Sequence, residues 1–157
     1  MALFSTIICC VNLTENSSDI VQYTRDLAKR DNAKVLIIHS MPPVSNLENY
    51  ITSNDIMKEI IESSRKRAQD YLNEFKTKNF NDMDAEAILL SGTPSRQLLE
   101  LADKRCADLI VMGSISHKGI FSRLMSKHSE DVIGNSRVPV LVIPNDLNLD
   151  CVPPEDF

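Results

Sequence analysis

This 157-residue sequence lacks the features that mark several common classes of function. It has no apolar run near the roughly eighteen residues that a membrane span needs. Its 17 Lys and Arg against 22 Asp and Glu give a formal net charge of −5, whereas nucleic acids and anionic membranes attract basic surfaces. We therefore expect neither nucleic acid nor a membrane as a partner.

Cysteine is also scarce, and its spacing argues against a metal site. The four cysteines are adjacent in sequence or far apart, form no C-x-x-C pair and have no histidine at zinc-ligand spacing. No basic segment precedes the short apolar stretch Ile7–Val11, so no secretory signal is expected. The sequence therefore predicts a cytoplasmic protein with reduced thiols and no bound metal.

What the sequence does contain is the composition of one globular domain. Hydrophobic residues make up 43% of it and charged residues 25%. A chain of this length buries roughly 70% of the surface that its unfolded form exposes, so it needs no metal ion or disulfide to stabilise its core. The last apolar run ends near Pro144, and an acidic stretch with two prolines follows. We expect one domain over residues 1–144 and a tail over residues 145–157.

Apolar runs alternate with amphipathic helices along this domain. Short continuous apolar runs are typical of strands that are covered on both faces. The five candidate strands are Ile7–Val11, Val35–Ile38, Ala85–Leu90, Asp108–Met112 and Val138–Ile143. Four helical patterns separate them, so the sequence predicts an α/β fold with one parallel sheet and helices on both faces.

Three of the helices have clear sequence signals. Ser18 is a good N-cap for the first helix, and Asp31-Asn32 marks its end. Thr93 followed by Pro94 predicts the start of the third helix. The second helix opens at Asn54-Asp55 and has an apolar stripe that should face the core. That stripe consists of Met57, Ile60, Ile61, Ser64, Ala68, Tyr71, Leu72 and Phe75.

Parallel sheets of this kind bind ligands beyond the carboxyl ends of their strands, at the point where the strand order reverses. The segments that follow the predicted strands are therefore the candidate site. They are residues 12–17, 39–41, 91–93 and 113–119. His39 ends a buried strand, and we expect it to be a hydrogen-bonded structural imidazole rather than a catalytic one.

Three catalytic or phosphate-binding schemes do not fit these segments. A phosphate-accepting receiver domain needs carboxylates where Asn12 and Ser91 stand. A nucleophile elbow needs G-x-S-x-G, and residues 113–117 lack that spacing. A P-loop or dinucleotide fingerprint needs several glycines, and residues 13–16 contain none. We therefore expect no catalytic residues.

The loop after Gly113 remains as a candidate anion site. It is rich in small hydroxyl side chains and is followed by Lys118, Arg123 and Lys127. Backbone N–H groups at the start of a helix, together with the positive end of the helix dipole, attract anions.

Several segments together resemble the universal stress protein family, over residues 4–144. They are IICCVNLTENS (7–17), LIIHS (36–40), GTP (92–94), ADLIVMGS (107–114), RLM (123–125) and VPVLVIP (138–144). The resemblance implies a Rossmann-like α/β fold with a five-stranded parallel sheet in the order 3-2-1-4-5. It also implies a homodimer in which the last strands of two subunits pair, here through Val138, Val140 and Val142.

The resemblance also implies a test for ATP binding. Members that bind ATP carry an Asp after the first strand and the motif G-x-x-G, nine residues, then G-[ST]. The Asp position is Asn12 here, and the motif falls on Gly113, Ser116, Ser126 and Lys127, so one of three glycines is kept. A serine Cβ restricts the approach of backbone to phosphate, although the charge of Lys127 offsets part of that loss.

The expected function is that of a cytoplasmic, non-catalytic homodimer that acts in stress responses through protein partners, with weak or absent ATP binding and no required cofactor. A nucleotide-dependent switch that binds ATP with magnesium, with at most slow hydrolysis, is the first alternative. A sensor of small anions or metabolites is the second. The expected ligand-binding residues are Asn12, Ser40, Gly113, Ser114, Ser116, Ser126 and Lys127.

Overall fold

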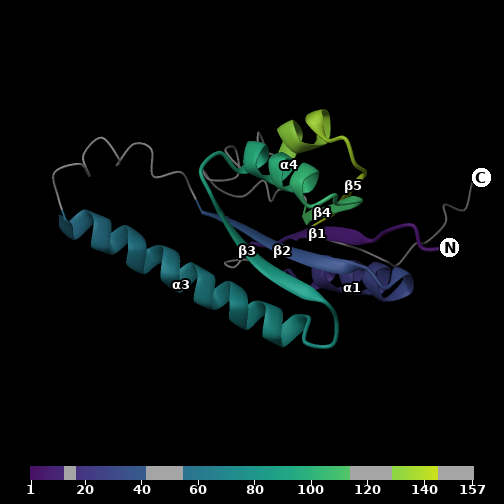
Figure 1. Cartoon of the computed structure of the whole chain (residues 1–157), viewed down its shortest axis with the longest axis horizontal. Helices are drawn as coiled ribbons and strands as arrows, with labels where there is room; N and C mark the ends of the chain where they lie inside the picture. Colours follow the sequence, from purple (N-terminus) through teal and green to yellow (C-terminus); the bar gives the residue numbers. More distant parts are fainter. Residues whose placement is uncertain (13–16, 42–54, 114–128, 145–157) are drawn as a thin grey trace, which may run out of the picture.

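Five parallel strands form one sheet with the order β3-β2-β1-β4-β5 (Figure 1). The computed structural model describes residues 1–12, 17–41, 55–113 and 129–144. The strands are β1 (Thr6–Cys10), β2 (Lys34–Met41), β3 (Ala85–Ser91), β4 (Leu109–Gly113) and β5 (Val140–Ile143). This topology confirms the predicted sheet and its order.

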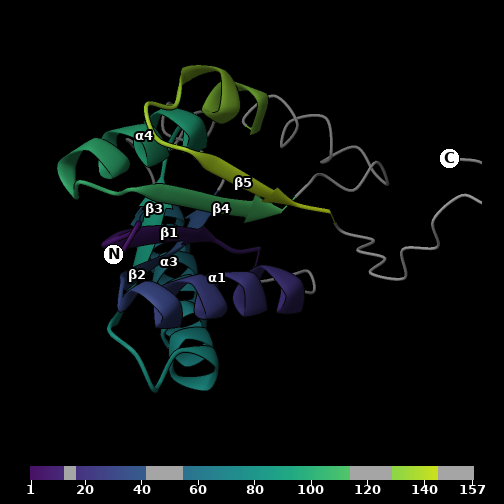
Figure 2. The same cartoon turned by 90° about the vertical axis from the view of Figure 1, so that its right-hand side faces the viewer.

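Helices cover both faces of the sheet, as the sequence predicted (Figure 2). They are α1 (Ser18–Asp31), α3 (Asp55–Asn79), α4 (Pro94–Lys104) and a helical segment over residues 129–135. One apolar cluster joins α1 and α3 to one face of the sheet, and a second joins α4 and Val132 to the other. None of the described helices is long and apolar enough to span a membrane.

The core lies on both faces of the sheet, which explains why the sequence of the central strand β1 is one continuous apolar run. Ile7 and Cys9 of β1 belong to the cluster beneath α1, whereas Ile8 belongs to the cluster beneath α4. Cys10 packs against that second cluster, so the adjacent cysteines lie on opposite faces. Burial raises the pKa of the Cys9 thiol to about 12, because a thiolate there would lose its hydration. The thiol is therefore neutral and acts as a small core side chain.

Most strand boundaries differ from the prediction by one to three residues, and the starts of β5 and α1 differ for reasons that the structure shows. The last strand begins at Val140 and not at Val138, because Ser136 Oγ accepts the Val138 N–H at 3.2 Å and donates to the Val138 carbonyl at 2.7 Å. Those two bonds hold Val138 in a turn. Helix α1 has Ser17 at its N-cap, so Ser18 is its first residue and not its cap.

The prediction that the whole stripe of α3 is buried was wrong. Leu72 is fully buried, whereas Ile60 is 53% exposed and Tyr71 is 56% exposed. A helix of 25 residues extends about 38 Å, whereas the seven-residue strand β3 that it covers extends about 23 Å. The first half of α3, which includes Ile60 but not Tyr71, therefore projects beyond the sheet (Figure 1).

Two aspartates hold the amino end of the sheet. The Asp31 carboxylate accepts the backbone N–H groups of Leu3 at 2.9 Å and Phe4 at 2.8 Å. The Asp108 carboxylate accepts those of the next two residues at 2.6 and 3.0 Å. The start of β1 is thus tied to the end of α1 and to the residue before β4, which fixes where β1 ends at the opposite edge.

Candidate functional site

The strand order reverses between β1 and β4. From β1 the chain proceeds outward through β2 and β3, then returns to add β4 on the other side of β1. Helix α1 follows β1 and residues 129–135 follow β4, and they pack on opposite faces of the sheet. In parallel sheets of this kind, ligands bind beyond the carboxyl ends of the strands at such a point. Asn12 lies just after β1, and Gly113 is the last residue of β4. The topology therefore places two of the predicted site residues at the switch point.

Backbone and side-chain bonds fix the end of β1 beside β2. The Val11 N–H donates to the Ile38 carbonyl at 2.9 Å. The Val11 carbonyl lies 3.0 Å from Nδ1 of His39. Because a carbonyl oxygen only accepts, Nδ1 carries a proton and donates it in this bond. His39 thus has the structural role predicted for it, and Val11 is bonded to β2 through both of its backbone groups.

Asn12 is held from its other side by the start of α1. Its carbonyl accepts the hydroxyl of Ser17 at 3.3 Å, and its own side chain is half-buried. Its amide both donates and accepts hydrogen bonds, whereas a carboxylate at this position would only accept and would carry charge. Asn12 therefore places a neutral amide, which can both donate and accept, beside the switch point.

Three adjacent strands bring three predicted residues to the same edge. Ser40, in β2, is half-buried and pairs in register with Leu90 of β3. Gly113 pairs in register with Ile143 of β5. With Asn12 these residues line the carboxyl edge on both sides of β1. The other predicted residues, Ser114, Ser116, Ser126 and Lys127, lie outside the described residues, as does the predicted anion loop.

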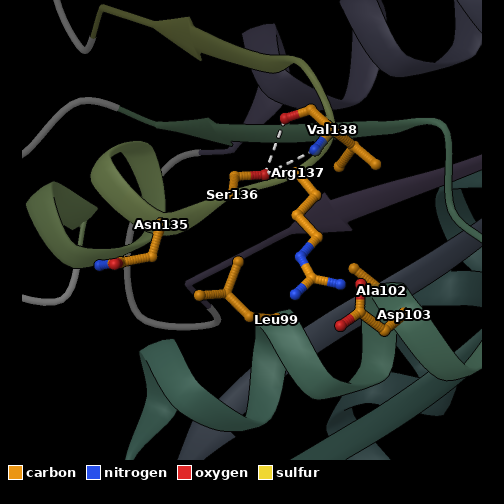
Figure 3. A pocket seen from close by; sticks show the side chains of 7 residues that line it. All are labelled: Leu99, Ala102, Asp103, Asn135, Ser136, Arg137 and Val138. Atoms are coloured by element: carbon orange, nitrogen blue, oxygen red, sulfur yellow. Dashed lines mark hydrogen bonds between the residues drawn. The ribbon is translucent and has the colours of Figure 1, made fainter.

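The structure also shows two hollows that the sequence did not predict. They have volumes of about 190 and 320 Å³ and share Leu99, Asp103 and Asn135, so together they form one groove between α4 and residues 131–138 (Figure 3). Asn12, Ser40 and Gly113, the predicted site residues that the structure describes, do not line them. The sequence signal was weak, because residues 135–138 are typical of a connection between a helix and a strand.

Metal ligands do not gather in the described part of the chain. There, no group of three or more His, Cys, Asp or Glu side chains lies close enough to hold an ion.

Comparisons with known proteins agree with this architecture. Universal stress protein MJ0531 of Methanocaldococcus jannaschii is 27% identical over 146 residues, which cover 90% of this chain and 82% of that protein. The solved structure of universal stress protein UspA from Lactobacillus plantarum matches with a TM-score of 0.69 and 14% identity, over 91% of this chain and 99% of that one. A universal stress protein solved in complex with cAMP matches with a TM-score of 0.62 and 23% identity, over 91% and 98%.

The fold, with its switch point between β1 and β4, is thus shared with solved universal stress proteins. A sequence model of the universal stress protein family matches residues 3–144. That match covers most of the 157 residues, so the chain belongs to the universal stress protein family.

Proposed function

We propose that this chain is a non-catalytic stress-response protein that binds an adenine nucleotide weakly beyond β1 and β4 and acts through contacts with other proteins. The observation that carries the proposal is the position of Asn12, a neutral amide at the switch point of the sheet. Cys9, Cys10 and Cys106 are free thiols, which supports a cytoplasmic setting.

The neutral amide favours weak binding for a physical reason. Hydrogen bonds to charged groups stabilise by about 1.5–3 kcal/mol, and those between neutral groups by about 1 kcal/mol. A ligand hydroxyl or amino group would therefore gain less from Asn12 than from the Asp expected in ATP-binding members. The serines at 116 and 126 are expected to weaken phosphate contacts further, because each adds a Cβ where the ATP motif has glycine.

A tighter nucleotide-dependent switch is the second candidate. It is supported by the universal stress protein of the same fold that was solved with cAMP. A cyclic monophosphate needs fewer phosphate contacts than a triphosphate, so a site with one remaining motif glycine suits it better. The two candidates differ in affinity and in preference among adenine nucleotides.

Calorimetric titration with ATP and magnesium, AMP and cAMP separates the candidates. We expect dissociation constants weaker than micromolar for all three, and no hydrolysis of ATP. Asn12→Asp should strengthen binding about tenfold, because it restores a charged acceptor. Asn73→Asp makes the same chemical change on the exposed side of α3 and should have no effect. A micromolar or tighter constant for the unchanged protein would establish the switch instead.

Gly113→Asp gives a second test of where the nucleotide lies. A carboxylate at the end of β4 would repel phosphate and fill the binding site, so any measurable binding should disappear. Unchanged affinity in this variant would move the nucleotide away from the switch point.

We also propose that two copies pair through β5. This strand is the edge of the sheet, and Val142 on it is 38% exposed. An uncovered edge strand offers unpaired N–H and C=O groups to another strand. Native mass spectrometry should show a dimer, and Val142→Lys should shift it to monomer because pairing would bring two like charges together. A monomer at micromolar concentration without the substitution would exclude this interface.

A further inference from the structure

The smaller of the two hollows lies between the last turns of α4 and the turn that enters β5 (Figure 3). Its floor is apolar and consists of Leu99, Ala102 and Val138, all of which belong to or pack against the core cluster beneath α4. Its volume of about 190 Å³ is below the roughly 300–1,000 Å³ typical of sites for drug-sized ligands. The hollow therefore suits a ligand smaller than a drug-sized molecule.

Arg137 enters this hollow from a stiffened turn. Ser136 Oγ is bonded to both backbone groups of Val138, and the Ser136 N–H donates to the Val132 carbonyl at 2.9 Å. These bonds fix the backbone on both sides of Arg137. Its guanidinium points toward α4 (Figure 3). In the part of the chain that the structure describes, no carboxylate lies within ion-pair distance of Arg137. A guanidinium recognises carboxylates by paired hydrogen bonds.

Asp103 faces the same hollow from the opposite wall (Figure 3). It lies in the last turn of α4, where the negative end of the helix dipole disfavours a carboxylate. Its carboxylate makes no ion pair or hydrogen bond with other described residues. A charge that weakens its own helix breaks a local rule of stability, and such positions are expected at functional sites. The dipole and the carboxylate would both attract a cation there.

The two walls thus carry opposite unpaired charges on either side of an apolar floor. We propose that this pocket binds a small zwitterion, namely a free α-amino acid with an aliphatic side chain. Its carboxylate bonds to Arg137, its ammonium group to Asp103, and its side chain lies on Leu99, Ala102 and Val138. This site is separate from the proposed nucleotide site beyond β1 and β4 and does not depend on nucleotide binding.

The second hollow gives the ligand side chain room to extend beyond Leu99. It continues from the first along α4, past Leu99 toward Ser95, and is larger, at about 320 Å³. The cation on this wall, Arg96, is already paired with Glu100 at 2.9 Å, so it does not compete for the ligand carboxylate. Room for a branched chain therefore lies toward Ser95, with the charged end fixed by Arg137.

Direct pairing of Arg137 with Asp103 is the competing arrangement. Both residues are exposed, and exposed ion pairs contribute little to stability. A zwitterion satisfies both charges at once and also buries apolar surface on the floor, so it can displace such a pair.

Titration of the ¹⁵N-labelled full-length protein with L-leucine tests the proposal. We expect saturable shifts in the amide signals of residues 99–103 and 135–138. Two leucine analogues separate the contributions of the charges: 4-methylpentanoate lacks the ammonium group, and 3-methylbutylamine lacks the carboxylate. Each should bind about tenfold more weakly than leucine, because each loses one charge-assisted contact.

Variants assign the two charges to their residues. Arg137→Gln should weaken leucine binding about tenfold and abolish the preference of the pocket for leucine over 3-methylbutylamine. Asp103→Asn should abolish its preference over 4-methylpentanoate. Arg65→Gln removes an exposed guanidinium from α3 and should change nothing. If Arg137→Gln disturbs signals across the protein, Arg137→Lys replaces it and should keep charge but lose the paired hydrogen bonds, with intermediate affinity.

Three results would overturn the proposal. One is the absence of saturable shifts at about 10 mM leucine, which is about ten times a dissociation constant of 1 mM. Another is equal binding of leucine and both analogues, which would show that the pocket does not recognise the charges of the ligand. The third is unchanged leucine affinity in both pocket variants.

Discussion

Nδ1 of His39 donates a hydrogen bond of 3.0 Å to the carbonyl oxygen of Val11, one residue before the Asn12 amide at the switch point. The bond joins β2 to the end of β1 where the regular ladder stops. The strength of this hydrogen bond therefore controls how rigidly the backbone at Asn12 is held, whether or not Asn12 contacts a ligand.

Removing this bond should loosen the site more than the fold. His39→Ala leaves the Val11 carbonyl without its partner and should lower the free energy of unfolding by about 1–3 kcal/mol. His39→Asn keeps a donor near the Nδ1 position and should recover much of the loss. Hydrogen exchange at residues 11–12 should rise in the alanine variant only. Equal exchange in both variants would show that the imidazole does not hold β1.

Acid should weaken the fold through three carboxylates whose pKa values lie below their ordinary range. Arg25 and Lys29 lower the pKa of Asp82, Arg30 and two backbone N–H groups lower that of Asp31, and Arg105 lowers that of Glu86. A carboxyl whose pKa is lower in the folded state stabilises the fold above its unfolded pKa and loses that effect as the pH falls toward the folded pKa. Stability should therefore decline as the pH falls below about 4.5, near the ordinary values of 4.5 for Glu and 3.8 for Asp.

Urea unfolding at a series of pH values checks this decline. Asp82→Asn should flatten the curve below pH 4 and lower stability at pH 7, since it removes the partner of Arg25 and Lys29. Asp70→Asn, on the exposed part of α3, serves as the matched control and should leave the curve unchanged. If the Asp82→Asn curve keeps its full acid slope, the Arg25 pair is not a source of it.

The fold was predictable because its signals are local and agree with one another. Five buried runs alternate with helical patterns, and Thr93-Pro94 marks the start of α4 where the structure has it. The end of α1 was equally clear, since Asn32 takes the left-handed conformation of a C-cap at φ 54°.

The errors came from tertiary geometry that sequence patterns do not carry. Periodicity shows which face of α3 is apolar, but not that the sheet ends before Ile60. Val138 continues an apolar run in the sequence. The Ser136 hydroxyl is bonded to both backbone groups of Val138, however, and β5 begins two residues later. The groove was missed for a related reason, because Asp103 and Arg137 are 34 positions apart and face each other only after α4 packs beside residues 131–138.

Two glycines should respond in opposite ways to alanine. Gly92, between β3 and α4, has φ +116°, a conformation that a side chain rarely adopts. An added Cβ would lie 2.6 Å from Nε2 of Gln97, but that side chain can move, so the backbone conformation determines the cost. Gly92→Ala should destabilise by about 1–3 kcal/mol. Gly134, in the helical segment 129–135, has open space around it, and Gly134→Ala should stabilise by about 0.5–1 kcal/mol.

Denaturant unfolding of both variants measures this difference. The sign reversal is the informative result, because the two substitutions add the same methyl group. A loss of stability in Gly134→Ala as large as that in Gly92→Ala would mean that the volume of the methyl group, and not φ, governs the response.

The two halves of α3 should also differ in their sensitivity to truncation. Leu72 is fully buried against the sheet, so Leu72→Ala should cost about 2–5 kcal/mol through lost apolar contacts and the cavity left behind. Ile60 is 53% exposed on the projecting half, so Ile60→Ala should change the free energy of unfolding by less than about 0.5 kcal/mol. Chemical unfolding at low protein concentration compares them. A loss for Ile60→Ala that approaches the loss for Leu72→Ala would show that the first half of α3 is covered in solution, and a dependence of that loss on protein concentration would identify the cover as a second copy of the chain.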